Sequence, residues 1–182
     1  MSTQLKILRK KLGLSLESLA QACGLTRSYL SKVERGLAMP SIAAGLKLAK
    51  ALNVRVEELF TEESDTPLQG GYSLMREQDR RPWGADGQAS AYAVLAHQVG
   101  RRNVLPFMVH PPQEFRGSSF KEHQGEEFLF VHEGCVEVDF GSERIILQRG
   151  DALQFNAQKP HRVRSCGDQL AHLLVVVEAG QD

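Results

Sequence analysis

The stretch of sequence that decides the fold of the first third of the chain runs from residue 16 to residue 36 and reads LESLAQACGLTRSYLSKVERG. Its apolar residues recur at helical spacing, which places Leu16, Leu19 and Cys23 on one face of a first helix. A glycine follows where this helix has to stop, and Thr26 is a typical N-cap for a second helix. Two short helices joined by such a turn predict a helix-turn-helix, in which the second helix enters the major groove of DNA.

Helical periodicity extends on both sides of this stretch, over residues 5–60. A helix rich in leucine precedes it, a fourth helix opens after Pro40 and closes near Asn53, and a short fifth turn covers residues 56–60. The sequence therefore predicts a five-helix domain, to which we assign residues 1–62.

The pattern changes beyond that domain. Residues 63–71 are polar, lack periodicity and end in two glycines, which is typical of a linker. Short apolar or alternating runs separated by Gly, Pro and Asn then predict an all-β sandwich or barrel over residues 72–182, so the whole chain is an α+β protein of two domains. The predicted strands cover residues 104–109, 128–131, 136–140, 144–147, 152–155, 161–164 and 170–178.

The net charge of zero, from 22 Lys+Arg and 22 Asp+Glu in 182 residues, conceals a division between the two domains. Residues 1–60 hold 10 basic and 4 acidic side chains, net +6, and the remainder of the chain is net −6. A basic domain is typical of a nucleic-acid partner.

Other sequence features exclude several classes of protein. No apolar run approaches the roughly 20 residues that cross a bilayer, and the amphipathic start does not resemble a signal peptide, so we expect no membrane partner. Three cysteines at these spacings match no disulfide framework or zinc knuckle, which predicts a reducing, cytoplasmic setting. We interpret Cys135 and Cys166 as bystanders, since nothing in the adjacent sequence lowers the pKa of either thiol.

Arg27, Ser28 and Lys32 are the predicted DNA readers of the second helix. In a helix that begins at Thr26, an apolar face turns inward and these three side chains remain outside near the N-terminal end. Arg27 can bind guanine through two hydrogen bonds, Ser28 is a weaker reader, and Lys32 can contact a base or a phosphate. The alternative is that they are solvated charges on a helix surface.

The pattern L-x-x-L-A-x-x-x-G-L-T-x-S-Y-L-S-K-V-E-R-G, followed by P-S-x5-K-L-A-x-A-L, resembles the phage-repressor-like (XRE) helix-turn-helix family over residues 5–60. The resemblance implies the lambda-repressor-like five-helix fold, with Arg9 and Glu34 as a structural ion pair. It also implies that Arg35 and Ser41 lie closer to phosphates. The DNA-facing set implied by the resemblance is Ser15, Thr26, Arg27, Ser28, Lys32, Arg35 and Ser41.

A second group of chemically informative residues lies in the β half. His123 and Glu127 stand four residues apart where a turn meets a strand, and His161 opens a later strand. Two imidazoles and one carboxylate on adjacent strands can form a facial triad with open positions, an arrangement suited to iron and related divalent metals.

The stretches around these residues resemble the two cupin motifs, G-x5-H-x-H-x3,4-E-x6-G and G-x5-P-x-G-x2-H-x3-N. The resemblance implies a jelly-roll barrel in which His123, Glu127 and His161 are three of the four family ligands. Lys121 stands in place of the first histidine. The site therefore holds either one divalent ion (Fe, Zn, Mn or Ni) or no metal, in which case the Lys121 ammonium pairs with Glu127.

The barrel interior is the predicted effector pocket. Alternation along the strands turns Glu127 and Leu129 inward, and Phe107 and Phe155 contribute apolar wall. The predicted lining is Lys121, His123, Glu127, His161, Phe107, Leu129 and Phe155; the alternative is that the apolar members only fill a small core. We expect His132 to be exposed; His97, His110 and His172 have no partner spacing, and we expect them at the surface or in satisfied strand positions.

A DNA-reading domain joined to a ligand-sized barrel predicts a sequence-specific transcriptional regulator, more specifically a repressor whose cupin domain binds a small-molecule effector. Because one recognition helix reads only a few base pairs, we expect a homodimer on a pseudo-palindromic operator in double-stranded DNA. The alternative is an enzyme, a mononuclear-iron cupin oxygenase or epoxidase, since this architecture resembles that of the iron-dependent epoxidase of fosfomycin biosynthesis. A third hypothesis is a nucleoid or scaffold protein that binds DNA without an effector.

Overall fold

The computed structural model describes residues 3–60, 72–80, 91–96, 104–115 and 118–178. The chain divides into two compact units, Met1–Pro67 and Leu68–Asp182, which are described separately below. The predicted linker, residues 63–71, lies outside the described residues, so the exact domain limits of 1–62 and 72–182 stay predictions.

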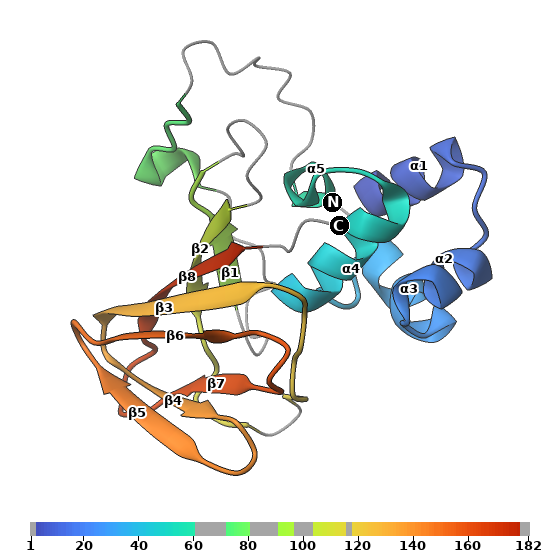
Figure 1. Ribbon diagram of the computed structural model, residues 1–182. Coiled ribbons are helices and arrows are strands. Elements are labelled where there is room, and N and C mark those ends of the chain that lie inside the picture. Colours follow the sequence, from blue (N-terminus) through green and yellow to red (C-terminus); the bar gives the residue numbers. More distant parts are fainter. Residues whose placement is uncertain (1–2, 61–71, 81–90, 97–103, 116–117, 179–182) are drawn as a thin grey trace. The chain divides into compact units, whose positions relative to one another are not determined.

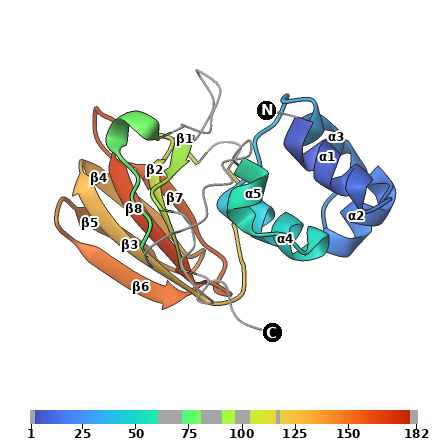
Figure 2. The ribbon, with the colours of Figure 1, turned by 90° about the horizontal axis from the view of Figure 1, so that it is seen from above.

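The first unit contains the five predicted helices (Figure 1). Helix α4 packs against α2 and α5, and α1 contacts α3 and α5 (Figure 2). The helices enclose one apolar core. Leu19, Leu30, Leu48 and Leu52 are the most completely buried side chains of this core. The helices are α1 (Thr3–Lys11), α2 (Leu16–Cys23), α3 (Arg27–Glu34), α4 (Ile42–Leu52) and α5 (Val56–Phe60).

Side-chain caps fix where these helices begin. The hydroxyls of Ser15, Thr26 and Ser41 each accept a hydrogen bond from the backbone N–H three residues later, at 3.0, 3.2 and 3.2 Å. These bonds satisfy amides that a helix leaves unpaired in its first turn. Gly24 and Asn53 end α2 and α4 in the left-handed conformation, with φ of 63° and 51°.

The predicted ion pair between Arg9 and Glu34 is confirmed. Arg9 Nε donates to Glu34 Oε1 at 2.6 Å and Arg9 Nη2 donates to Glu34 Oε2 at 3.1 Å, and both residues are buried. Arg9 Nη1 also donates to the carbonyl of Leu14 at 2.6 Å. The pair therefore ties α1 to α3 and to the turn that leads into α2.

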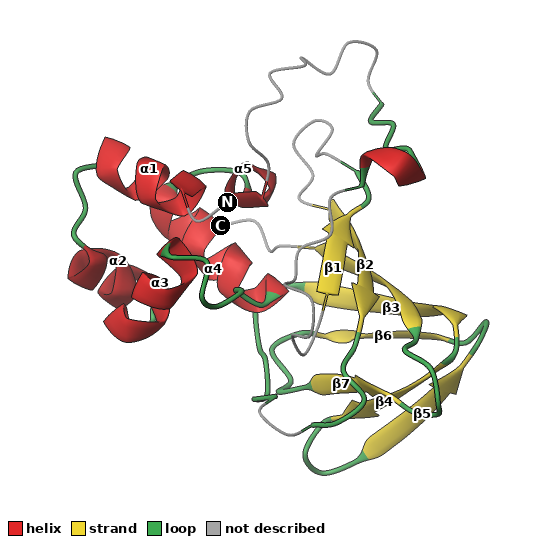
Figure 3. Ribbon diagram, turned by 180° about the vertical axis from the view of Figure 1, so that it is seen from behind, coloured by secondary structure: helices red, strands yellow, loops and turns green. Residues whose placement is uncertain are grey.

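The second unit is a two-layered β structure (Figures 1 and 3). One sheet has the strand order β1-β2-β8-β3-β6 and the other β5-β4-β7, with antiparallel neighbours throughout. A short 3-10 helix, η1 (Glu77–Asp79), precedes the strands. The strands are β1 (Ala91–Val94), β2 (Val104–His110), β3 (Glu126–Glu133), β4 (Cys135–Asp139), β5 (Arg144–Gln148), β6 (Ala152–Asn156), β7 (Arg162–Ser165) and β8 (His172–Glu178).

The seven predicted strands are all present, whereas β1 and η1 were not predicted. β1 has only four residues, too few for alternation to stand out from its polar surroundings. β1 is held in the sheet by pairing with β2 and by the edge-to-face contact of Tyr92 with Phe107, whose ring centroids lie 5.9 Å apart.

Alternation decides which side chains enter the barrel. Glu127, Leu129 and Val131 of β3 are buried, as are Val136 and Val138 of the facing β4. Phe107 and Leu129 flank Val175 in one row across β2, β8 and β3, and this row lies next to the one that contains Glu127. The barrel interior is thus apolar except near the start of β3.

The inference from spacing that the cysteines belong to no disulfide framework is wrong. Cys135 and Cys166 form a disulfide between Cα atoms 5.2 Å apart, and Cys23 is buried and free. The two residues are 31 positions apart in the sequence, but the pairing of Val136 with Ser165 places them opposite each other at one end of β4 and β7. Spacing alone could not reveal this pairing because it depends on the register of two strands.

Candidate functional site

The first candidate site is the outer surface of α3. Arg27, Ser28 and Lys32 are exposed, while Leu30 and Val33 of the same helix are buried in the bundle. This is the division that the sequence predicts, with polar groups available on one side of a rigid helix. Of the other residues predicted to face DNA, Ser15, Thr26 and Arg35 are exposed and Ser41 is half-buried.

Capping gives three of these residues a structural role as well. The hydroxyls of Ser15, Thr26 and Ser41 accept bonds from their own helices. Tyr29, which the sequence leaves ambiguous, packs beneath α3: its hydroxyl donates to the Met39 carbonyl at 3.3 Å, and burial raises its pKa. Substitutions of Ser15, Thr26 or Ser41 would therefore alter the start of α2, α3 or α4, respectively, together with the surface.

The second candidate site lies at the barrel end where β3 and β7 begin. His123 precedes β3, Glu127 is the second residue of β3, and His161 immediately precedes β7. Backbone bonds hold the two loops in place: His123 N–H donates to the Ala157 carbonyl at 3.0 Å, and His161 exchanges two bonds with Lys121. Residues from two separate parts of the sequence, 121–127 and 157–161, therefore converge.

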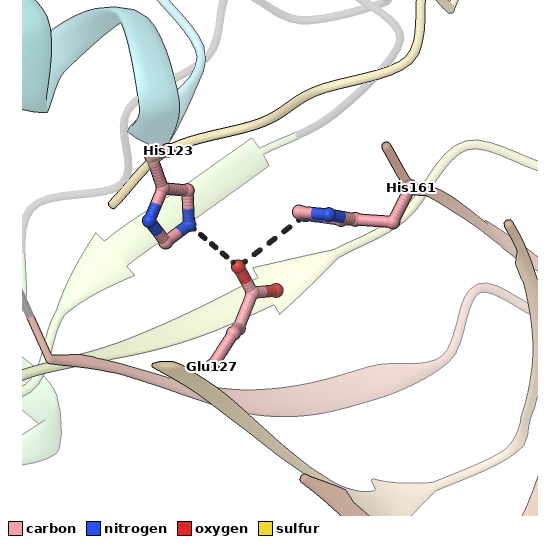
Figure 4. Close-up of side chains that lie close together, drawn as sticks. All are labelled: His123, Glu127 and His161. Atoms are coloured by element: carbon pink, nitrogen blue, oxygen red, sulfur yellow. Dashed lines mark hydrogen bonds and ion pairs between the residues drawn. The ribbon is translucent and has the colours of Figure 1, made fainter. Parts of the chain in front are cut away.

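Both imidazoles point toward the same carboxylate oxygen, as Figure 4 shows. His123 Nε2 lies 3.0 Å and His161 Nε2 lies 3.4 Å from Glu127 Oε2. All three side chains are buried, and their potential ligand atoms lie within 4.8 Å of one another. The predicted triad of His123, Glu127 and His161 is thus one compact group.

The second ring nitrogen of each histidine is committed to the backbone. His123 Nδ1 is 3.0 Å from the Gln124 carbonyl and His161 Nδ1 is 2.9 Å from the Lys159 carbonyl. Because a carbonyl oxygen can only accept, both Nδ1 atoms carry the proton, and a neutral ring then presents the Nε2 lone pair to the site.

The electrostatics of the triad favour a shared cation. Burial opposes ionisation of Glu127, but hydrogen bonds from His123 and His161 hold its pKa below the ordinary value. Burial also disfavours charge on His161, yet the contact with Glu127 raises the pKa of that imidazole. A buried carboxylate facing two Nε2 atoms needs positive charge between them, either as protons or as a metal ion.

The donor set fits a divalent metal. Two Nε2 atoms and one carboxylate oxygen, each histidine oriented through Nδ1 by a carbonyl, are the ligands and outer contacts of a mononuclear site with open positions. In such a site the protein would supply His123, Glu127 and His161, and a bound ion would supply Lewis acidity at the open positions.

The predicted pocket residues have different relations to this group. The Phe155 ring lies 4.8 Å from the His161 ring, centroid to centroid, while Phe107 and Leu129 lie buried one row further inside. The Lys121 backbone pairs with His161, and its ammonium donates to Ser119 Oγ at 2.7 Å. Phe155 and Lys121 therefore adjoin the triad, whereas Phe107 and Leu129 form the floor behind it.

Two side-chain groups were missed by sequence reasoning. His110, His132 and His172 adjoin one another on the side of the larger sheet away from the core, with the His110 and His172 rings 4.5 Å apart, so these strand histidines have contacts that their spacing did not reveal. Burial and the neighbouring His172 lower the pKa of His110. Their spacing carried no signal because β2, β8 and β3 are distant in sequence; His97 lies outside the described residues.

The other missed group covers the outer side of the smaller sheet. Buried Asp139 and Glu137 of β4 pair with three arginines of the flanking strands, among which Arg162 lies over the rings of Phe115 and Phe120 at 4.4 and 4.5 Å. The alternation of β4, in which every second residue is acidic, was the only available signal. The arginines are Arg144, Arg162 and Arg164.

Comparisons with known proteins agree with both halves of this architecture. The family model described as helix-turn-helix matches residues 5–59, and the one described as cupin domain matches residues 106–177. The chain is 34% identical over 65 residues to the uncharacterized HTH-type transcriptional regulator YgzD of Bacillus subtilis, of which it covers 98%. The chain belongs to the HTH-type transcriptional regulators.

A second relative matches over most of both chains. The HTH-type transcriptional regulator PuuR of Escherichia coli is 28% identical over 160 residues, which cover 87% of this chain and 83% of that protein. The regulator therefore combines an XRE-type helix-turn-helix with a cupin domain, as the sequence predicts.

Solved structures share the fold. An HTH_3 family transcriptional regulator from Vibrio cholerae aligns over 98% of this chain and 95% of that chain, with a TM-score of 0.66 and 23% identity. Hydroxypropylphosphonic acid epoxidase from S. wedmorenis, in complex with fosfomycin, aligns over 97% of this chain and 95% of that chain, with a TM-score of 0.51 and 22% identity. Within the described residues, no helix has the length and apolar character needed to cross a bilayer.

Proposed function

We propose that this regulator is a repressor that reads a pseudo-palindromic operator through the exposed surface of α3. The observation that carries the proposal is the pair of exposed cations, Arg27 and Lys32, on a helix whose opposite side is locked into the bundle. Arg27 lies at the N-terminal end of the helix, where a base-reading side chain is expected, and Ser28 beside it is a second reader. Ser15 and Thr26 also face the DNA, and Arg35 and Ser41 lie closer to the phosphates.

The test is operator binding by the double variant Arg27→Ala, Lys32→Ala, on a duplex selected by the wild-type protein from random sequences. We expect a loss of about 1 to 3 kcal/mol for the base contact of Arg27, and a decrease of about 1 in the salt slope if Lys32 binds a phosphate. Binding curves at several salt concentrations measure both quantities.

The matched control is Lys10→Ala, Lys47→Ala, which removes the same charge from exposed positions on α1 and α4. It should retain operator preference. An equal loss of affinity in both double variants would refute the α3 surface as the reader.

We further propose that the regulator acts as a homodimer in the cytoplasm. The proposed domain limits are residues 1–62 for the DNA-binding domain and residues 72–182 for the cupin domain. One α3 reads one half-site, so a specific complex needs two copies about one DNA turn apart. Light scattering should give twice the chain mass of 20.2 kDa, and a mass of one chain at operator-binding concentrations would contradict the homodimer.

The cupin barrel, in this proposal, binds a small-molecule effector at the triad of His123, Glu127 and His161, with one divalent ion such as Fe, Zn, Mn or Ni. The convergent lone pairs and the neighbouring apolar side chains of Phe155, Phe107 and Leu129 support it, and the Lys121 backbone pairs with that of His161. An effector can change operator binding only by its different affinity for two states of the protein. Operator affinity that stays constant across candidate effectors in a gel-shift titration would count against this role.

A second candidate function is oxidation by a mononuclear iron cupin, so that the protein would be an enzyme. The triad and the structural likeness to an epoxidase favour it. Oxygen consumption by the protein loaded with ferrous iron, abolished by Glu127→Ala, would establish the enzyme, whereas salt-sensitive operator binding without oxygen consumption supports the regulator alone.

A further inference from the structure

The disulfide between Cys135 and Cys166 is unexpected in a DNA-binding regulator. DNA lies in a reducing compartment, where lasting structural disulfides are rare and those that form are commonly redox-sensing. Both cysteines are only half-buried, so a small oxidant or reductant can approach them, whereas Cys23 is buried. The compartment and the exposure of the two cysteines therefore indicate that this disulfide has a role beyond stability.

The bond lies at the corner where the chain changes sheets. β3 passes into β4 through Gly134, and β7 passes into β8 through residues 166–171, so both connections link the larger sheet to the smaller one. They touch at Gly134, where an added Cβ would meet Ala171 Cα at 3.0 Å. The disulfide joins the first residue of β4, directly after Gly134, to the first residue of the connection from β7 to β8.

Contacts that involve no sulfur hold the corner as well. Cys166 N–H donates to the Cys135 carbonyl at 2.8 Å. Buried Ser165 donates through Oγ to the Pro111 carbonyl at 2.7 Å and accepts from Ala171 N–H at 2.9 Å. Because these bonds remain after reduction, the two thiols stay close enough to form the disulfide again.

The same two segments that end in the cysteines begin with the triad. Glu127 stands at the start of β3, eight residues before Cys135, and His161 stands five residues before Cys166. β3 and β7 belong to different sheets and share no ladder of hydrogen bonds. The corner holds them together at one end, and the contact of His161 with Glu127 and the two backbone bonds between His161 and Lys121 hold them at the other.

We propose that Cys135 and Cys166 are a reversible thiol–disulfide pair, and that its oxidation strengthens divalent-metal binding by His123, Glu127 and His161. This inference rests on the proposed metal site. The disulfide restrains β3 against β7, so less freedom is lost when the three ligands close on an ion. Reduction leaves the fold intact but lets the two sheets shift at the triad end.

A low-molecular-weight disulfide serves as the oxidant. One cysteine thiolate attacks a sulfur of the oxidant, a mixed disulfide forms and one small thiolate leaves. The second cysteine thiolate then attacks the protein sulfur of the mixed disulfide and expels the other half. The two cysteines lose two electrons and two protons in total, and the oxidant becomes two thiols.

The experiment compares full-length protein equilibrated with oxidised glutathione against protein reduced by a phosphine. Alkylation in denaturant should find one free thiol in the oxidised form and three in the reduced form. Calorimetric titration with Co²⁺ alone should show roughly fivefold tighter binding by the oxidised form. Hydrogen exchange at the amides of Lys121 and His161, which bond to each other, should be slower in that form.

The variant Cys135→Ser, Cys166→Ser should show reduced-state affinity and exchange under both treatments, while the matched control Cys23→Ser should respond as the wild type does. Equal Co²⁺ affinity in the two redox forms would overturn the inference. If neither form binds Co²⁺, the proposed metal site fails, and equal exchange rates at Lys121 and His161 then overturn the inference as well. Failure of glutathione mixtures to oxidise and reduce the Cys135–Cys166 pair in the folded protein would also overturn the inference.

Discussion

Glu127 is the residue on which the barrel site depends. Its carboxylate is the common partner of His123 and His161. Each histidine ring is held in this orientation by the bond between its Nδ1 and a backbone carbonyl. A lone buried carboxylate would be strongly destabilising, so these partners explain how the interior tolerates a charge.

At this scale we predict that His161→Ala abolishes high-affinity binding of a divalent metal. Loss of an oriented ligand should lower the affinity by about 100-fold or more, because changes to outer contacts alone cost 10- to 100-fold. Calorimetry with Co²⁺ measures it. His132→Ala removes an exposed histidine outside the triad and should leave this affinity unchanged; parallel losses in both variants would argue for a different metal site.

A further prediction at the residue scale concerns Asp139. A hydrogen bond from Gly141 N–H and the contacts with Arg162 and Arg144 hold the pKa of Asp139 below its ordinary value of 3.8. The folded state therefore favours the ionised form, so this stabilisation is present above the ordinary pKa and is lost as pH falls through the lower folded-state pKa.

Asp139→Asn should thus lower the free energy of unfolding at pH 7. The difference in this free energy between the variant and the wild type should become smaller as the solution is acidified below about pH 4. Urea denaturation at a series of pH values measures this. Asp168→Asn, an exposed acidic position in the connection to β8, is the control and should change little. A difference from the wild type that is independent of pH would mean that Asp139 acts through packing and not through its charge.

At the scale of the element, α3 shows how one helix combines folding and reading. Thr26 caps it, Leu30 and Val33 anchor it, and the exposed side chains remain available. The Arg9–Glu34 pair fixes its C-terminal end, so removal of one partner would leave a buried charge at a cost of about 3 kcal/mol.

Neighbouring residues of α3 should separate these roles. Thr26→Ala should lower the free energy of unfolding by about 1 kcal/mol because an N-cap bond is lost. Ser28→Ala, two residues further on and exposed, should change stability by less than about 0.5 kcal/mol and weaken discrimination between operator sequences. Thermal unfolding and binding to the selected operator are the measurements; normal stability in Thr26→Ala would show that the cap contributes nothing to the fold.

At the scale of the whole molecule, each of the two units has its own buried core. Two domains that each bury a core can unfold independently. The metal site belongs to the second unit alone, since all three candidate ligands lie between residues 123 and 161.

We therefore predict two unfolding transitions in calorimetry of the full chain. Addition of Co²⁺ should raise the temperature of one transition only, because a ligand stabilises the unit to which it binds. A fragment of residues 1–67 should reproduce the transition whose temperature does not change with Co²⁺. A single transition that shifts as a whole with Co²⁺ would show that the two units unfold together.

Several features could be predicted from the sequence because their signals are local. The helical spacing around Leu19 and Leu30, the caps at Ser15 and Thr26, and the change to short alternating runs each involve residues within one or two turns of one another. The i, i+4 pair of His123 and Glu127 is local in the same way. The helix-turn-helix, the β barrel and most of the triad followed from such patterns.

Only the tertiary structure decided which distant residues meet. Strand register placed Cys135 opposite Cys166, brought His110 beside His172 and joined the acidic β4 to three arginines. Register depends on the cores of both sheets packing together, and a shift by one residue would reverse every side chain. The sequence by itself determined the two domains and their chemistry, whereas the long-range packing of the barrel decided the disulfide and its relation to the triad.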